Sequence, residues 1–244
     1  MTILITGAAQ GIGASMAKLL ATPANVLILT DLQSDKLNEF IQSLPPTKKV
    51  IAVGGDITQD SVIQQLGEVM VTESIDVLIN NAGISNKLNL FEALTVDELD
   101  LSYKINVRAP FLLIQSALRV MKSKTSSMII NVASRANIYG YYRMAAYSAS
   151  KAAVTALAGT VALENPNIKA ITLIPGRTNT PMQANLRGTE EAMKAQSPDY
   201  VAEVLSKLIS GEIQTESGNS VIVDFGAYKI VTELDRNDLH KNMH

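Results

Sequence analysis

Tyr147 and Lys151 stand four positions apart in an alanine-rich stretch with the composition of a helix. Residues four apart on a helix share one face, so the phenol and the ammonium would be neighbours. A cation beside a phenol favours the phenolate, and we expect it to lower the tyrosine pKa from its ordinary value of about 10. Such a tyrosine can donate a proton to a carbonyl oxygen or accept one from an alcohol.

The remaining tyrosines lack a lysine at this spacing. Tyr139 has Arg143 four positions on, and an arginine does not readily give up its proton. The other five tyrosines each have an uncharged residue four positions on; they are Tyr103, Tyr141, Tyr142, Tyr200 and Tyr228. A buried tyrosine beside a lysine that extends along the helix is the alternative interpretation of Tyr147 and Lys151.

Ser134 is a third residue that could take part in this chemistry. It follows the apolar run 128–132 and would lie at the carboxyl end of a strand, where ligands bind in open α/β sheets. Its hydroxyl could hold a substrate oxygen and stabilise charge that develops there. A serine that only forms a turn would also fit this position.

A glycine-rich turn, Gly7-Ala8-Ala9-Gln10-Gly11-Ile12-Gly13, follows an apolar run at residues 2–6 and precedes a helical pattern. Gly7 permits a tight turn, Gly11 lets the backbone approach a pyrophosphate, and Gly13 allows the helix to pack close to the sheet. The helix N-terminus then presents free N–H groups to the phosphates. This turn predicts dinucleotide binding, and an ordinary glycine-rich turn is the alternative.

Asp31 ends the second apolar run, eighteen positions after Gly13, close to the spacing of an acid that binds the adenosine ribose. A carboxylate there accepts hydrogen bonds from both ribose hydroxyls and repels a 2′-phosphate. Leu32 follows it and Gln10 lies in the turn, so we expect no cation near such a phosphate. We therefore predict NAD as the cofactor in preference to NADP.

Short apolar runs alternate with helical patterns along the whole chain. Runs that are nearly all apolar fit parallel strands covered on both faces, so the fold class is predicted to be α/β, a doubly wound sheet of about seven strands. The expected strands are 2–6, 26–30, 50–54, 75–80, 128–132, 168–174 and 220–223, and the expected helices are 12–20, 34–43, 59–72, 97–122, 147–164 and 198–210.

No linker-like stretch divides the chain, so we expect one domain over residues 1–227. Within it, residues 181–197 have no clear strand or helix pattern and are predicted to form a short, mobile lid. Residues 228–244 are expected to be a polar C-terminal tail.

Composition narrows the function classes. Apolar residues make up 47% and charged residues 18%, enough for a sizeable core, and a net charge of −2 without a basic block does not favour nucleic acid or a membrane surface. There is no cysteine, and His240 and His244 are the only histidines, so we expect no metal site. With neither a leader nor a membrane span expected, the protein is predicted to be cytoplasmic.

Together these motifs make the chain similar to the short-chain dehydrogenase/reductase family, from about residue 2 to residue 227. The matching residues occur in the family's order: Thr6-Gly7-x-x-x-Gly11-Ile12-Gly13, Asp31, Asp56-Ile57, Asn80-Asn81-Ala82-Gly83, Asn106, Ser134, Tyr147-x-x-x-Lys151 and Pro175-Gly176-x-x-x-Thr180. Each motif is modest alone, but their order and spacing are highly specific.

The resemblance implies roles for four catalytic residues. Tyr147 would be the general acid/base and Ser134 would orient the substrate carbonyl. Lys151 would bind the nicotinamide ribose and lower the tyrosine pKa. Asn106 would hold a water that links Lys151 to solvent, although read alone it is only an amide on a helix.

The resemblance also implies a cofactor site and an assembly. Asp56 and Ile57 would contact the adenine, and residues 80–83, including Asn80, Ala82 and Gly83, would line the cofactor. The loop from Pro175 and Gly176 onward would hold the carboxamide through Thr178 and Thr180. Relatives commonly form dimers or tetramers through their long helices, so a homodimer or homotetramer is expected.

Two departures from the family pattern concern the substrate. Asn137 stands where many members have glycine, and Arg135 directly follows Ser134, so either residue could shape the pocket. The lid is also shorter than in the family's acyl-carrier-protein reductases. Tyr139, Tyr141, Tyr142 and Arg143 are expected to line the substrate pocket, but the residues do not identify the substrate.

The leading hypothesis is an oxidoreductase that transfers a hydride between NAD(H) and a small secondary alcohol or carbonyl substrate, with Tyr147 as the general acid/base. One alternative is an isomerase, epimerase or dehydratase that uses the same groups. The other is a regulator that binds NAD without catalysis, since function does not follow from fold alone.

Overall fold

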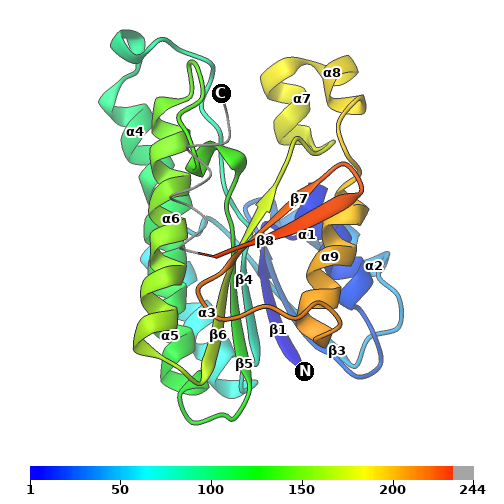
Figure 1. Ribbon diagram of the computed structural model, residues 1–244. Helices are drawn as coiled ribbons and strands as arrows, with labels where there is room; N and C mark the ends of the chain where they lie inside the picture. The colour runs from blue at the N-terminus through cyan, green and yellow to red at the C-terminus, as the bar shows by residue number, and fades with distance from the viewer. Residues whose placement is uncertain (233–244) are drawn as a thin grey trace.

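The computed structural model describes residues 1–232, and its centre is one eight-stranded sheet with the order β3-β2-β1-β4-β5-β6-β7-β8 (Figure 1). Strands β1 to β7 run parallel, and β8 pairs antiparallel with β7. The strands are β1 Thr2–Thr6, β2 Val26–Asp31, β3 Lys49–Gly54, β4 Val77–Asn80, β5 Ser127–Val132, β6 Ile168–Pro175, β7 Ser220–Asp224 and β8 Ala227–Val231. The prediction of a doubly wound α/β sheet is confirmed.

Helices cover both faces of this sheet, which explains why central strands such as β1 and β4 are buried along their whole length. On one face lie α1 (Gly11–Leu20), α2 (Ser34–Gln42) and α9 (Pro198–Ser210), and on the other α3 (Asp60–Thr72), α5 (Ala109–Met121) and α6 (Ala145–Glu164) (Figure 1). Alternate side chains of β1 serve the two cores: Ile3 and Ile5 pack under the first group and Leu4 under the second.

The helix expected at 97–122 is interrupted by one wide turn. It consists of α4 (Val96–Tyr103), a π-helical turn at Lys104–Arg108 and α5, and the Ala109 N–H bonds to the Lys104 carbonyl five residues back. Pro110 has no N–H to donate to the Asn106 carbonyl, which an unbroken α-helix would require. The interruption places Asn106 at the widened turn, a feature that often marks functional sites.

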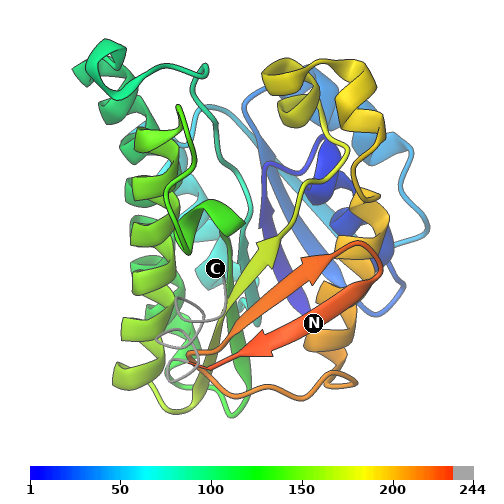
Figure 2. The same ribbon diagram turned by 45° about the horizontal axis from the view of Figure 1, so that its top comes forward.

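The predicted lid contains two short helices, which the sequence pattern did not reveal. They are α7 (Pro181–Arg187) and α8 (Thr189–Met193), separated by Gly188 with φ of 90°. Thr180 caps α7 by accepting from the Gln183 N–H at 3.2 Å, and proline suits the first helical position. Figures 1 and 2 show both helices over one side of the sheet at the carboxyl ends of its strands. The mobility of this segment stays a prediction.

The predicted polar tail begins later than residue 228. Residues 227–231 form β8, which closes the edge of the sheet beside β7. Tyr228 and Lys229 are exposed on this edge strand, so the segment lacks the apolar run by which the other strands were predicted. The rest of the expected tail, including His240 and His244, lies outside the described residues. Among residues 1–232, no helix combines the length and apolar character needed to cross a membrane.

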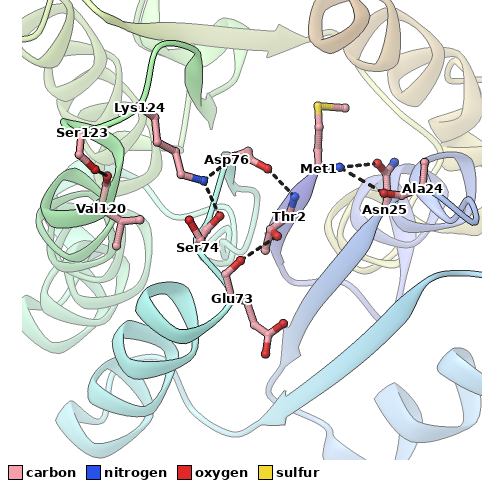
Figure 3. Close-up of polar contacts among 10 residues, drawn as sticks. All are labelled: Met1, Thr2, Ala24, Asn25, Glu73, Ser74, Asp76, Val120, Ser123 and Lys124. Atoms are coloured by element: carbon pink, nitrogen blue, oxygen red, sulfur yellow. Dashed lines mark hydrogen bonds and ion pairs between the residues drawn. The ribbon is translucent and has the colours of Figure 1, made fainter.

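A partly buried polar cluster connects the amino ends of β1 and β4 to the segment before β5 (Figure 3). The Asp76 carboxylate, just before β4, accepts from the Thr2 N–H at 2.8 Å and from the Lys124 ammonium. The Thr2 hydroxyl donates to the Glu73 carbonyl at 2.9 Å. Burial acts to raise the pKa of Asp76, but the hydrogen bonds from Lys124 and Thr2 outweigh it and lower the pKa below its ordinary value.

We predict that Asp76→Asn lowers the free energy of unfolding by about 1–2 kcal/mol at pH 7. A carboxyl whose pKa is lowered on folding contributes its stability above the unfolded pKa of about 3.9 and loses it as the pH falls through the folded pKa. The difference between wild type and variant should therefore shrink between about pH 5 and pH 3. Urea unfolding across this range measures it.

Asp100→Asn is the matched control, because Asp100 is exposed on α4. It should change the unfolding free energy by less than about 0.5 kcal/mol at any of these pH values. A constant difference between wild type and Asp76→Asn from pH 7 to pH 3 would show that the Asp76 charge does not matter.

Candidate active site

A cavity of about 960 Å³ opens at the carboxyl ends of the central strands, and most of the predicted site residues line it. Asp31 and Asp56 lie at one end, the glycine-rich turn in the middle, and Tyr147 at the other end. The predicted residues in its wall are Gly7, Gln10, Gly11, Ile12, Asp31, Leu32, Asp56, Ile57, Ala82, Gly83, Ser134, Tyr147, Lys151, Pro175, Gly176, Thr178 and Thr180. Gly13, Asn80 and Asn106 lie behind this wall.

The glycine-rich turn has the geometry that a pyrophosphate requires. Gly7 and Gly11 have φ of 66° and 56°, in the left-handed region. A Cβ on Gly13 would lie 2.0 Å from the Gly7 carbonyl oxygen, so only glycine lets α1 approach so closely. No side chain caps α1, which leaves the first N–H groups of the helix free beside the cavity. These free donors and the bare backbone fit a bound dinucleotide.

Asn81, rather than Asn80, forms the wall of the cavity after β4. The Asn81 side chain donates to the carbonyl oxygens of Thr6 and Gly7 at 2.9 and 3.1 Å and holds the glycine-rich turn in place. Asn80 is only 3% exposed and donates to Asn131 Oδ1 at 2.9 Å. The Asn80 side chain therefore lies in the strand and outside the cavity wall, and its contact with the cofactor stays a prediction.

The Asp31 carboxylate lies at the end of the cavity where the adenosine ribose was expected. Its Oδ2 accepts from the Ala9 N–H at 2.9 Å, so the acid also fixes the glycine-rich turn. Contrary to our expectation, a cation lies beside the glycine-rich turn. Lys36, in the first turn of α2, places its Nζ 2.8 Å from Gln10 Oε1. The sequence analysis did not predict the contact between Lys36 and Gln10, because the two residues are 26 positions apart and meet only after β2 has formed beside β1.

Tyr147 lies on the first turn of α6, and its side chain is hydrogen-bonded to that of Ser134. Burial raises the pKa of Tyr147, and the hydrogen bond from Ser134 only partly offsets this effect. We expected the neighbouring ammonium to lower this pKa, and the structure differs. The Lys151 Nζ lies 5.8 Å from the centre of the Tyr147 ring and bonds elsewhere, so burial dominates.

Lys151 is a buried ammonium, 5% exposed, one helical turn after Tyr147. Its Nζ donates to the Val132 carbonyl at the end of β5, at 2.9 Å. Burial lowers the pKa of Lys151 to about 8. The group can therefore exchange a proton near physiological pH, which an exposed lysine does only rarely.

Asn106 is held behind Gly83 by all of its polar atoms. Its Oδ1 accepts from the Ile84 N–H at 2.9 Å, and its Nδ2 donates to the Ile84 carbonyl at 3.0 Å and to Ser150 Oγ at 2.9 Å. A Cβ on Gly83 would lie 3.0 Å from Asn106 Oδ1 and 3.1 Å from Lys151 Nζ. The amide thus joins the loop after β4 to α6 beside the buried ammonium.

The structure adds an ion pair that the sequence analysis missed. Arg135, directly after Ser134, contacts Asp224 at the end of β7 at 2.5 Å and donates to the Tyr139 hydroxyl at 3.3 Å. Asp224 lies at a strand's carboxyl end, the position that drew attention to Ser134, and that rule could have found it. Asn137 bonds to Thr155 at 2.8 Å instead of entering the cavity.

Three of the four residues expected to form the substrate pocket are in the cavity wall: Tyr141, Tyr142 and Arg143. Tyr139 instead lies behind the wall, where it accepts from Arg135. Burial and the neighbouring Tyr139 raise the pKa of Tyr141 to about 12. Tyr141 thus stays protonated and can contribute a hydroxyl to the pocket but not a base.

Known proteins are similar to this chain in sequence and in fold. The family model described as short chain dehydrogenase matches residues 1–191. A short-chain dehydrogenase/reductase from Hericium erinaceus is 30% identical, over 93% of this chain and 97% of its own length. An NAD-dependent glycerol dehydrogenase from Listeria innocua is also 30% identical, over 93% of each chain.

A solved structure supports the same assignment. The 3-ketoacyl-(acyl-carrier-protein) reductase from Brucella melitensis, complexed with NADH, superposes with a TM-score of 0.83 and 25% identity, over 93% of this chain and 97% of that one. The chain belongs to the short-chain dehydrogenase/reductase family. This is a family of oxidoreductases that bind NAD(H) or NADP(H) and act on alcohol and carbonyl groups.

The buried ammonium predicts an unusual dependence of stability on pH. A lysine whose pKa is lowered on folding, here from 10.5 to about 8, binds fewer protons in the folded state between these values. Stability should therefore rise with pH across this interval. Lys151→Met should remove this rise and stabilise the protein at pH 7 by on the order of 2 kcal/mol.

Chemical unfolding at several values between pH 7 and pH 10.5 measures this effect. Lys122→Met, which changes an exposed lysine at the end of α5, should follow the wild-type curve. If the Lys151→Met and wild-type curves stayed parallel over the whole interval, the ammonium would not have a lowered pKa.

Proposed function

We propose that this protein is an NAD-dependent oxidoreductase that interconverts a secondary alcohol and its carbonyl. The observation that carries the proposal is the Tyr147 hydroxyl, buried in the cavity and hydrogen-bonded to Ser134, with Lys151 one turn further along α6. The nicotinamide, when bound, supplies or accepts the hydride. The chain supplies the matching proton and holds the reacting oxygen.

Tyr147 is the proton donor in the direction of carbonyl reduction. Its raised pKa keeps the hydroxyl protonated at neutral pH, so it can protonate the substrate oxygen as the carbonyl carbon receives the hydride. In the reverse direction it accepts the alcohol proton. The Ser134 hydroxyl stabilises the negative charge on that oxygen by hydrogen bonding.

Lys151 restores the proton that Tyr147 gives up. A pKa of about 8 lets it donate and recover a proton near neutral pH, and its positive charge stabilises a phenolate formed one turn away. Asn106 positions this ammonium by fixing Ser150 and the loop at Gly83 around it. A bound water beside Asn106 would complete a proton path to solvent.

The proposed cofactor contacts follow the wall of the cavity. Gly7, Gly11 and the first N–H groups of α1 would bind the pyrophosphate, with Gln10 and Ile12 beside them. Asp56 and Ile57 would meet the adenine, and Ala82 and Gly83 the middle of the molecule. The nicotinamide end would lie against the loop containing Pro175, Gly176, Thr178 and Thr180.

We propose NAD rather than NADP because of the charge on Asp31. This buried carboxylate would accept from a ribose hydroxyl, whereas a 2′-phosphate would place like charges together. Lys36 would reduce the preference for NAD, because its ammonium bonds to Gln10 at the same end of the cavity and could attract a 2′-phosphate. The Listeria relative's name records NAD dependence.

We further propose that the protein works as a homodimer or homotetramer in the cytoplasm. Large apolar side chains are exposed along α4 and α5, among them Leu101 at 48% and Phe111 at 44%. Several exposed apolar side chains on these two helices support a protein–protein contact there. The family resemblance implied an interface through the long helices near residues 100–122 and 147–164, and α4 and α5 cover the first of these.

We predict that Tyr147→Phe binds NADH within about twofold of wild type but reduces turnover at least 100-fold, because the proton donor is lost while the ring remains. Absorbance of reduced nicotinamide measures turnover with a panel of secondary alcohols and ketones, and NADH fluorescence measures binding. Tyr103→Phe, on α4 outside the cavity, is the control and should retain full activity.

Other outcomes would favour the alternatives. Substantial residual turnover in Tyr147→Phe would remove this residue from its role. Conversion of substrate without net change in the cofactor would favour an isomerase or epimerase. NADH binding without turnover of any compound would favour a regulator that senses the cofactor.

We predict that Asp31→Asn weakens NADH binding about tenfold and NADPH binding less, so the preference between them narrows. Asparagine retains one oxygen for the Ala9 N–H, which protects the glycine-rich turn. Lys36→Ala should have the opposite effect and weaken NADPH alone. Fluorescence titration of both cofactors tests the pair, and an unchanged ratio in Asp31→Asn would show that another group selects the cofactor.

A further inference from the structure

Three arginines that form no ion pair within residues 1–232 line the cavity wall: Arg143, Arg177 and Arg187. Arg143 lies in the loop before α6, and Arg187 ends α7 in the lid segment. Both are exposed, and neither forms an ion pair within residues 1–232. Arg143 and Arg187 reach the cavity from two different segments, and Arg177 reaches it from the loop after β6.

The charges around them do not cancel. Asp224 is the only acidic residue in this half of the described cavity wall, and it is already paired with Arg135 at 2.5 Å. Glu191 is bonded to Lys194 at 2.7 Å, which lowers its pKa. The charges of Arg177 and Arg187 make only a smaller contribution to this lowering. The chain as a whole carries a net charge of −2, so a positive cavity end is not a general property of the protein.

The backbone at Arg143 is held in an unfavourable conformation. Its φ of 63° lies in the left-handed region, which residues other than glycine adopt only rarely. The Asn89 N–H donates to the Arg143 carbonyl at 3.2 Å and stabilises this conformation. Strained residues of this kind gather at functional sites, where the surrounding structure fixes a side chain in one direction.

The floor between Tyr147 and the arginines is apolar. Met144 is buried against Tyr147, and Leu88, Tyr141 and Leu186 pack around them. A substrate in this space would place its reacting oxygen at Tyr147 and its carbon skeleton on this floor. Any charged group on the substrate would then reach the rim where the arginines lie.

We propose that the substrate carries an anionic group, a carboxylate or a phosphate, which Arg143 and Arg187 bind. This inference rests on the proposed function, since it names the class of alcohol or carbonyl compound that enters the same cavity. A guanidinium suits either anion because its parallel N–H groups match two oxygens at once. The two arginines thereby orient the substrate as well as attract it.

Binding to the NADH complex of Tyr147→Phe tests this inference without requiring turnover. Saturating NADH prevents the probe from occupying the pyrophosphate site. The probes are straight-chain hydroxycarboxylates of three to six carbons with their methyl esters, and glycerol 3-phosphate with glycerol. The best anion should bind at least about tenfold more tightly than its neutral partner, as measured by calorimetry. The carboxylate and phosphate arms show which anion the site takes.

Three substitutions in the same background locate the effect. Arg143→Gln should abolish the preference for the anion, and Arg187→Gln should reduce it. Arg119→Gln, an exposed arginine on α5 outside the cavity, should retain it. Anions that bind no better than their neutral partners, anions that do not bind, or a preference that survives Arg143→Gln would each overturn the inference.

Turnover in the Tyr147-containing protein separates the two proposals. Oxidation of neutral alcohols only, without anion binding, would refute the anionic substrate and leave the oxidoreductase proposal standing. Anion binding that depends on Arg143, without oxidation or reduction of any probe, would do the reverse.

Discussion

The buried ammonium of Lys151 is the constraint around which the site is built. A charge that is 5% exposed and bonds to one carbonyl, that of Val132, is costly to hold in place. Hydrogen bonds hold α6 against the sheet and against the π-helical turn at Lys104–Arg108. Asn131 donates to the Val154 carbonyl at 3.0 Å, and Asn106 donates to Ser150 at 2.9 Å. These bonds hold α6 in place beside the charge, and burial keeps the pKa of Lys151 low.

Close backbone contacts explain how the strand ends converge on this point. A Cβ at Gly176 would lie 2.1 Å from the Asp224 carboxylate, and one at Gly83 would lie about as close to the Asn106 and Lys151 side chains as atoms can pack. Side chains from neighbouring strands and α6 thus meet across positions that have none of their own. The missing side chains at these glycines leave room for polar groups from distant parts of the sequence. A substitution at Gly83 or Gly176 would therefore push those groups out of place.

The sequence predicted the sheet and most of the cavity wall because both follow from local patterns. Apolar runs defined β1 to β7, and the spacing of Tyr147 and Lys151 defined their shared helix face. Features that depend on tertiary packing were missed. Asn80 and Asn81 are neighbours, and only packing decides which one faces the cavity. Lys36 reaches Gln10, and Asp224 reaches Arg135, across separations that no local pattern records. The direction of the Tyr147 pKa shift also depends on burial, which spacing does not reveal.

The distribution of charge along the cavity gives its two ends different tasks. Asp31 and Asp56 make one end acidic, and Arg143 and Arg187 make the other basic. Under the proposed function, a dinucleotide entering in reverse would place its nicotinamide at Asp31 and its adenosine among the arginines, away from the Asp31 carboxylate proposed to accept from the adenosine ribose. The same polarity separates the two ligands, since an anionic substrate is repelled from the acidic end and attracted to the end that holds Tyr147. Under the two proposals, the orientation of both molecules would follow from fixed charges on the strand ends, on the loop before α6 and on the lid, before any chemistry at the tyrosine begins.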